Sequence, residues 1–171
     1  MTSSSQRIRE VIHHAASGMS PEQLEWRRAG KWSAAEILEH LSLTYSGSTL
    51  GLNRCIQAGK TLARKPNLKD RIVTFVVVKV GYLPSGREAP QGTRPKGVSG
   101  TQVLDELDRN LEAMDVTIQQ CEQRFGTSTK LLNHPILGPL TGPEWRKFHF
   151  VHARHHAKQI LKLRDNLLGR N

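Results

Sequence analysis

The stretch of sequence that decides the fold is residues 104–125, LDELDRNLEAMDVTIQQCEQRF. Its apolar side chains recur at alternating spacings of three and four residues, at Leu104, Leu107, Leu111, Met114, Ile118, Cys121 and Phe125. Sustained over three heptads, this spacing predicts one continuous helix that buries a narrow seam against other helices. Gly126 follows the last apolar residue and is expected to end the helix.

Start signals elsewhere in the chain predict further helices around this one. A Ser or Thr followed three residues later by Gln or Glu suits a helix start, because each side chain can satisfy a backbone N–H group there. Such pairs occur at Ser20–Gln23, Ser33–Glu36, Ser99–Gln102 and Thr141–Glu144. They predict helices that begin near residues 20, 33, 99 and 141, with another near the N-terminus. We expect the helix from Ser33 to reach about Ala58 and the last helix to run from about Gly142 to Leu168.

Two connectors lie between these helices. In the first, residues 72–83 (IVTFVVVKVGYL) are apolar but too few for a membrane span, which needs about 20 residues. Their β-branched residues would suit a strand, but no partner strand is evident, and we predict a short buried helix. Residues 84–100, rich in Pro and Gly, should cross the bundle as an irregular loop. The second connector is residues 127–140.

These elements predict an all-α, single-domain protein over residues 1–171: a four-helix bundle with one long crossover connection and short extra helices. The N-terminus lacks the apolar core of a signal peptide, and Cys55 and Cys121 belong to no CxxC pair, so we expect a cytoplasmic protein with free thiols and no membrane association. The net charge of +10 permits nucleic-acid binding. Because the basic residues are spread along the chain, a solvated basic surface is the favoured interpretation.

A cluster of histidines in the last helix offers metal chemistry. Residues 147–157 read KFHFVHARHHA. His152 and His156 are four residues apart, so on a helix both imidazoles project from one face and can reach one ion at about 2.0–2.1 Å. The HExxH motif has this spacing, but its glutamate is missing here, so the pattern does not support a metalloprotease. The pair lies on a core-facing stripe, where imidazoles need partners. From spacing alone, a metal site and a solvated pair stay open.

His40 is a candidate third ligand. It lies one turn after Ile37 on the helix from Ser33, beside a stripe of small residues made up of Thr44, Gly47 and Gly51. Such a stripe either allows close helix approach or leaves a cavity. Three histidines would leave one position on the metal for water or substrate, as in catalytic rather than structural sites.

Four further residues could support the metal, although no catalytic residue can be named from the sequence. Glu36 is one turn before His40 and could be a carboxylate partner of a ligand, but its place in the capping box is a sufficient structural role. His149 and His155 could replace a ligand or move protons, or they could be satisfied interior or boundary histidines. Gln159 could orient a histidine or hold substrate.

The segments around these histidines resemble the DinB/YfiT-like superfamily. Residues 32–41, WSAAEILEHL, resemble its W…E…HL block. Residues 134–141 (HPILGPLT), followed by Glu144-Trp145, His152, His155-His156 and Gln159, are similar to its C-terminal block, most closely in the DUF1569 branch. The resemblance implies a DinB-type bundle, frequently dimeric. It also implies zinc or nickel held by one histidine of the second bundle helix and two of the last, which fall on His40, His152 and His156.

The resemblance implies several functions. Some members look like S-transferases that use small thiols, and others look like isomerases or hydrolases. We therefore expect a divalent-metal-dependent enzyme with a small-molecule substrate, with transfer to a low-molecular-weight thiol as the first choice and hydrolysis as the second. Arg154 or Lys158 could meet an acidic thiol, or they could equally be surface charges. The alternative is a non-catalytic, stress-associated protein that binds a metal or ligand, for which we expect a shallow or plugged cavity at the histidines.

Overall fold

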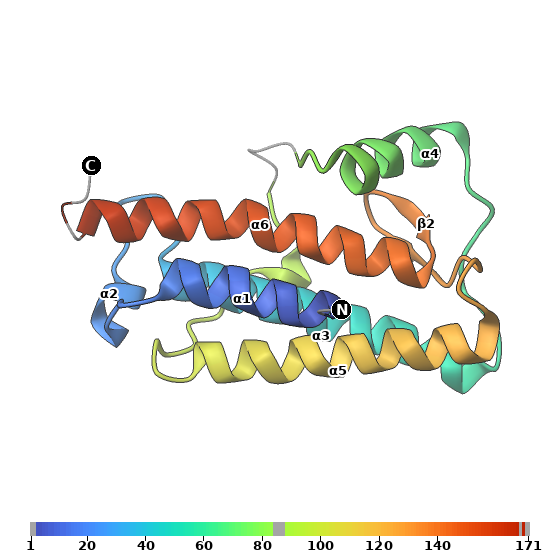
Figure 1. The fold of residues 1–171 in the computed structure, drawn as a ribbon, viewed down its shortest axis with the longest axis horizontal. Coiled ribbons are helices and arrows are strands. Elements are labelled where there is room, and N and C mark those ends of the chain that lie inside the picture. Colours follow the sequence, from blue (N-terminus) through green and yellow to red (C-terminus); the bar gives the residue numbers. More distant parts are fainter. Residues whose placement is uncertain (1–2, 84–87, 168, 170–171) are drawn as a thin grey trace.

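Four long helices form the predicted bundle (Figure 1). The computed structural model describes residues 3–83, 88–167 and 169. Its elements are α1 (Ser4–Ala16), α2 (Pro21–Glu25), α3 (Ala34–Ala58), α4 (Leu68–Thr74), the π-helical turn η1 (Phe75–Val80), the 3-10 turn η2 (Gln91–Thr93), α5 (Val103–Phe125), strands β1 (Leu132–His134) and β2 (Gly138–Leu140), and α6 (Gly142–Leu167). The all-α prediction is confirmed, with one small hairpin added. Leu168 and residues 84–87 of the predicted elements lie outside the described residues.

The bundle consists of two parallel helix pairs, α3 with α5 and α1 with α6 (Figure 1). Asn110 of α5 donates a hydrogen bond to Ser42 of α3, and about three turns further on Cys121 contacts the Leu52 carbonyl, so the two helices run in the same direction. A chain that leaves the end of α3 must therefore travel back along the bundle before α5 can start. Residues 59–102 make this return and are the predicted long crossover.

The seam on α5 is buried as its spacing predicts. Leu107, Leu111, Met114, Ile118 and Cys121 are at most 1% exposed. The predicted start of this helix was wrong, because α5 begins at Val103 and its N-cap residue, Gln102, makes no capping bond with its side chain. Residues before it are held elsewhere: the Gly100 N–H donates to the Glu25 carboxylate. The other three predicted capping boxes are formed.

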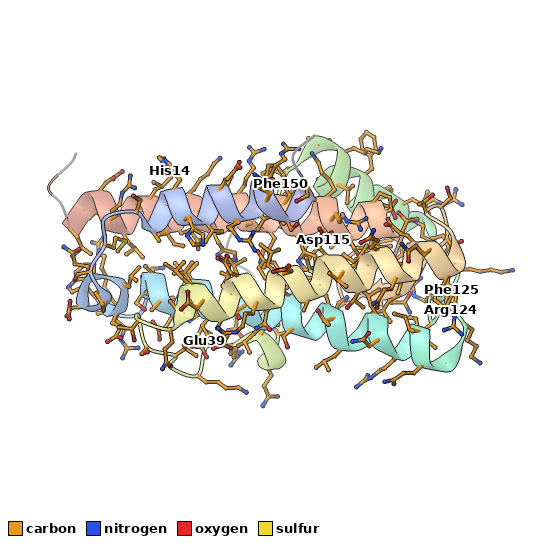
Figure 2. The ribbon with its side chains drawn as sticks, turned by 60° about the horizontal axis from the view of Figure 1, so that its bottom comes forward. His14, Glu39, Asp115, Arg124, Phe125 and Phe150 are labelled. Carbon is orange, nitrogen blue, oxygen red and sulfur yellow. The ribbon has the colours of Figure 1, made fainter. Side chains whose placement is uncertain are left out.

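Polar contacts fasten the two helix pairs to each other. Asp115 of α5 (Figure 2) accepts hydrogen bonds from Ser5 of α1 and from Arg146 of α6. Arg146 also pairs with Glu122, about two turns further along α5. The side chain of Phe150 on α6 lies beside α1, where the Arg7 guanidinium is 4.5 Å from its ring centre (Figure 2). The bundle is thus closed on the α1 side, opposite the face where the crossover lies.

The apolar run at residues 72–83 is helical in part, but the prediction that it is buried was wrong. It forms the end of α4 and η1, which lie outside the bundle against α6 and the hairpin (Figure 1). Val77 and Val78 are buried, whereas Ile72, Phe75, Val80 and Tyr82 are all more than half exposed. One face of a helix can pack in that position, and the other faces solvent. Within the part of the chain that the structure describes, no helix has both the length and the apolar character needed to cross a membrane.

The hairpin and the small-residue stripe of α3 fit together. β1 and β2 pair antiparallel, with Leu132 opposite Leu140. The Leu132 side chain packs so closely against Gly51 that a Cβ atom there would overlap it. Two turns earlier on α3, Thr44 and Gly47 instead border a cavity. The stripe therefore provides close approach at one end and an open space at the other.

Candidate metal centre

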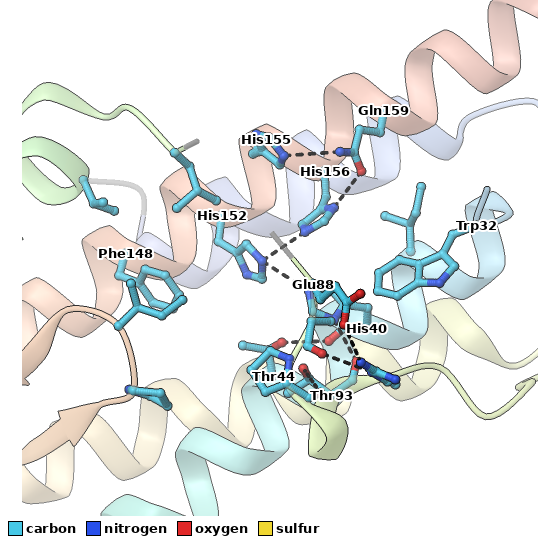
Figure 3. A pocket seen from close by; sticks show the side chains of 18 of the residues that line it. Trp32, His40, Thr44, Glu88, Thr93, Phe148, His152, His155, His156 and Gln159 are labelled. Carbon is cyan, nitrogen blue, oxygen red and sulfur yellow. Dashed lines mark hydrogen bonds and ion pairs between the residues drawn. The ribbon is translucent and has the colours of Figure 1, made fainter. Parts of the chain in front are cut away.

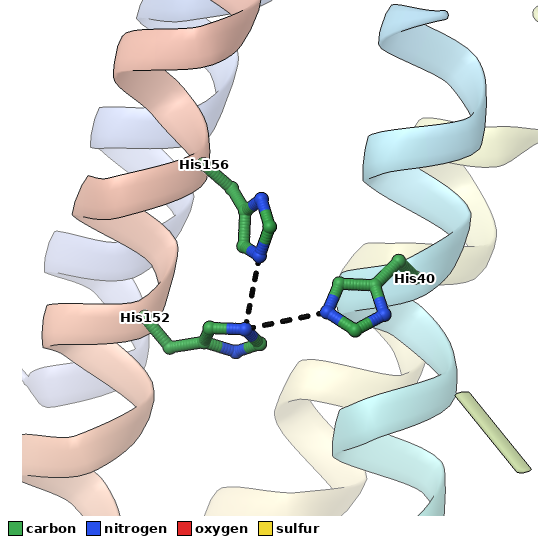
Figure 4. A group of neighbouring side chains, drawn as sticks. All are labelled: His40, His152 and His156. Carbon is green, nitrogen blue, oxygen red and sulfur yellow. Dashed lines mark hydrogen bonds between the residues drawn. The ribbon is translucent and has the colours of Figure 1, made fainter. Parts of the chain in front are cut away.

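The three predicted ligands converge between α3 and α6 (Figure 4). His40 comes from α3, and His152 and His156 come from successive turns of α6. The His152 Nε2 atom is 3.3 Å from Nε2 of His40 and 3.0 Å from Nε2 of His156, and all three candidate ligand atoms lie within 4.8 Å of one another. A tetrahedral ion with bonds of about 2.0–2.1 Å separates neighbouring ligand nitrogens by roughly 3.3–3.4 Å. The cluster has the dimensions to hold a metal ion.

Burial keeps these imidazoles neutral. His40, His152 and His156 are 5%, 8% and 8% exposed. Desolvation lowers the pKa of His40, lowers that of His156 to about 3, and holds the pKa of His152 well below its usual range. At neutral pH each ring therefore retains one nitrogen lone pair that can bind a cation.

Hydrogen bonds on the far side of two rings decide where those lone pairs point. Nδ1 of His40 donates to the Thr93 carbonyl oxygen at 2.8 Å, since a carbonyl can only accept. Nδ1 of His156 donates to the Gln159 side-chain oxygen at 2.9 Å, while the amide nitrogen of Gln159 donates to His155 at 3.2 Å. The Nε2 atoms of His40 and His156 are therefore both acceptors, and both face His152.

His152 cannot satisfy both neighbours by hydrogen bonding. A neutral imidazole carries one N–H group, so its Nε2 atom can donate to His40 or to His156 but not to both. Its other nitrogen, Nδ1, is buried and has no partner among the described residues. The ring is held by stacking on Phe148, with centroids 5.5 Å apart and planes 13° apart. A cation among the three Nε2 atoms would satisfy all of them at once, which is the chemical fit of this donor set to a metal.

The four predicted supporting residues lie in different places. Gln159 connects His156 to the half-buried His155, so both lie beside the cluster. The carboxylate of Glu36 accepts from the Ser33 N–H and pairs with Arg27, which are contacts of the helix cap. His149 is fully buried and turned away from the cluster: its Nε2 atom lies 3.1 Å from the Ser48 hydroxyl, and burial lowers its pKa to about 3.

Two residues that the sequence analysis missed hold the crossover loop over the site. The carboxylate of Glu39, which is only 2% exposed, accepts hydrogen bonds from the backbone N–H groups of Lys96, Gly97 and Val98 at 2.8, 2.9 and 3.1 Å. This anchor places the Thr93 carbonyl at His40. A carboxylate between the buried Leu38 and Leu41 was a signal that could have pointed to Glu39. Thr93 acts through its backbone, so its residue type carries no signal.

A cavity of about 1400 Å³ opens beside the histidines (Figure 3). Its walls come from α3, α6, η1, the hairpin and the loop that contains Thr93. Neither Arg154 nor Lys158 belongs to the described residues that line it, which favours the interpretation of both as surface charges. Each lies two residues after a candidate ligand and thus projects from the opposite face of α6.

The chain belongs to the DUF1569 family, described as "Protein of unknown function (DUF1569)", whose family model matches residues 6–163. It is also similar to "Uncharacterized protein YuaE" of Bacillus subtilis (strain 168), with 23% identity over 161 residues that cover 88% of each chain. No solved structure matches the chain. Family membership agrees with the DUF1569 branch to which the motif residues pointed.

Proposed function

We propose that this protein is a divalent-metal-dependent enzyme that holds zinc or nickel through His40, His152 and His156, as its resemblance to the DinB/YfiT-like superfamily implies. The observation that carries the proposal is the convergence of three buried, neutral imidazoles whose Nε2 atoms have no mutually satisfying pattern of hydrogen bonds. Imidazole ligands suit both zinc and nickel. Three ligands leave a further position, which would face the cavity.

The residues around the cluster would prepare it for catalysis. Thr93 and Gln159 hold the rings of His40 and His156 with their lone pairs directed inward, which raises the basicity of the ligands and restricts their rotation. Phe148 covers one side of His152, and Trp32 lies 5.2 Å from the ring of His40. When bound, a divalent metal supplies Lewis acidity that lowers the pKa of a thiol or water. The half-buried His155 could accept a proton at the cavity edge.

The nucleophile would come from outside the protein. Cys55 and Cys121 are buried, and burial raises the pKa of both thiols, that of Cys121 to about 11. Neither is among the described residues that line the cavity. The enzyme would therefore activate either a low-molecular-weight thiol or water. We place thiol transfer first, because of the resemblance to S-transferases, and hydrolysis second.

Metal analysis tests the proposal most directly. Protein freed of metal with a chelator is titrated with zinc and with nickel by isothermal titration calorimetry, and the native metal is identified by elemental analysis. We expect one ion per chain and a rise in thermal stability, worth about 2.7 kcal/mol at a free metal concentration 100-fold above Kd. Folded wild-type protein that binds neither ion would refute the proposal.

Variants locate the site. His152→Ala should remove the binding, because it deletes the ligand that contacts both others. The matched control is His14→Ala, which removes an exposed histidine of α1 and should leave the affinity unchanged. Circular dichroism confirms that each variant is folded. Assays with small thiols and with ester or amide substrates then separate transfer from hydrolysis.

A further inference from the structure

The cavity is elongated and has the histidine cluster in its middle. It follows α6 from Phe148 to beyond Lys162, and these two residues are 14 positions apart, which is about 21 Å along a helix. His152 and His156 lie between them. Figure 3 shows Phe148 on one side of the cluster and Trp32 on the other. A molecule that fills the cavity must therefore extend in both directions from the histidines.

The half of the cavity at Phe148 is mostly apolar. The side chains that face it are those of η1 and the segment before it, together with the turn of the hairpin: Ile72, Val73, Val76, Val77, Ile136 and Leu137. None of these can hydrogen-bond through its side chain. The hairpin also contributes two polar side chains to the lining, those of Asn133 and His134, and the His134 ring packs against Phe148 with ring centroids 4.3 Å apart. The cavity explains in part why some apolar residues are exposed, because Ile72 of the crossover and Ile136 of the hairpin turn both line it. A ligand portion bound here gains by leaving water.

The other half of the cavity is cationic. Arg28, Lys31 and Lys162 line it, and none takes part in an ion pair among the described residues. Two carboxylates also line the cavity among the described residues, and both have partners. Glu36 is occupied by the helix cap and by Arg27, and Glu88 pairs with Arg94, which also lines the cavity. Unpaired cations on one side of a site favour an anionic ligand group, and Arg can hold a carboxylate or phosphate with two hydrogen bonds.

We infer that the substrate is an amphipathic anion, with an apolar body in the hairpin half of the cavity and a carboxylate or phosphate bound at Arg28, Lys31 and Lys162. The group that reacts would lie between these two portions, at the histidine cluster. This assignment of a substrate class rests on the proposed metal-dependent function, but the binding itself needs no metal. A small polar molecule that reacts with the activated thiol or water does not fit this assignment, because it would leave the apolar half filled only with water.

Calorimetry with model ligands tests the inference on the full chain, with and without bound zinc. Dodecanoate and dodecyl phosphate are the anionic probes, dodecanol is the uncharged probe, and acetate and inorganic phosphate lack the apolar body. We expect the two anionic probes to bind and dodecanol to bind at least about tenfold more weakly than they do. The short anions should not bind. Preference between carboxylate and phosphate identifies the anion. Equal affinity for dodecanol and dodecanoate, or no binding of any probe, would overturn the inference.

Variants test the two halves separately. Lys162→Ala combined with Arg28→Ala should weaken dodecanoate at least tenfold and leave dodecanol unchanged, while Ile136→Asp should weaken both. Lys158→Ala is the matched control, since Lys158 lies one turn from Lys162 on α6 but is not among the described residues that line the cavity. Dodecanoate affinity that is insensitive to Ile136→Asp and to the cationic pair would also overturn the inference. Zinc titration separates the two proposals. A protein that binds zinc but not dodecanoate refutes only the substrate class. A protein that binds dodecanoate but neither zinc nor nickel refutes only the metal-dependent function.

Discussion

His149 should make the protein sensitive to acid, although it is not part of the histidine cluster. Its ring is completely buried, and burial lowers its pKa from 6.5 to about 3. In the unfolded chain the same side chain takes up a proton near pH 6.5. Because the folded pKa is the lower one, the contribution of neutral His149 to stability is complete above about pH 6.5 and is lost as the pH falls toward the folded value.

The size of this effect follows from the two pKa values. Between about pH 7 and pH 5, the unfolded state gains most of a proton at His149 and the folded state gains almost none. The linkage relation converts this difference into a loss of about 2 kcal/mol of unfolding free energy. That is a substantial share of the 5–15 kcal/mol that typically stabilises a domain.

His149→Phe removes this titration and retains an aromatic ring between Tyr45 and Trp145, which flank His149 with ring centroids 5.3 and 5.8 Å away. The Ser48 hydroxyl can still donate to the Thr44 carbonyl. Urea unfolding is measured at pH 7 and pH 5 with a chelator present, so that metal binding does not contribute. We expect the wild type to lose about 2 kcal/mol more than the variant over this interval.

The other buried histidines are present in both proteins, so most of their contribution cancels from the comparison. His14→Phe, at an exposed position, should lose as much stability as the wild type. An equal loss for His149→Phe and the wild type would refute the reasoning, because it would mean that His149 takes up its proton equally in the folded and unfolded states.

Three further predictions concern the site and its supports. Gln159→Ala should weaken zinc about 10- to 100-fold with little change in the stability of the metal-free protein, and unchanged affinity by calorimetry would contradict the role of Gln159 in orienting a ligand. Glu39→Gln should cost about 1–3 kcal/mol and increase hydrogen exchange at the three amides that Glu39 binds; exchange rates like those of the wild type would argue against the anchor. Gly138→Ala should cost about 1–3 kcal/mol in urea unfolding, because φ is +75° and the Asp70 carboxylate occupies the space of a Cβ atom. Gly47→Ala, in an open helical position, should instead stabilise the protein by roughly 0.5–1 kcal/mol. Similar changes for the two variants would disprove the explanation.

The helices could be predicted because their signals are local. Spacings of three and four residues place the seam from Leu107 to Cys121 on one face, whatever packs against it. The capping boxes at Ser20, Ser33 and Thr141 depend on contacts three residues apart. Ser99 carries the same pattern, but Gly100 is bound to Glu25, 75 residues earlier in the chain. A competing contact at that distance has no local signature.

The formation of the hairpin and the exposure of the apolar crossover segment also depend on contacts with segments that are distant in the sequence. β1 and β2 have three residues each and include Pro139, so they show no strand pattern of their own. The close fit of Leu132 against Gly51 of α3 helps to fix their position. Whether Phe75 or Val77 is buried depends on which face of η1 turns toward α6, which composition does not reveal.

The same division applies to the candidate metal site. Sequence spacing alone determined that His152 and His156 share a face of one helix. An α-helix has 3.6 residues per turn, so residues four apart always lie about one turn apart on the same face. Only the tertiary structure decided that His40 reaches them, since that distance depends on how α3 packs beside α6. It also decided that the Thr93 carbonyl, held in place by Glu39, directs the His40 lone pair toward the other two rings. Local geometry is set by covalent bonds and backbone angles, whereas contacts between distant segments exist only once the core has brought the helices together.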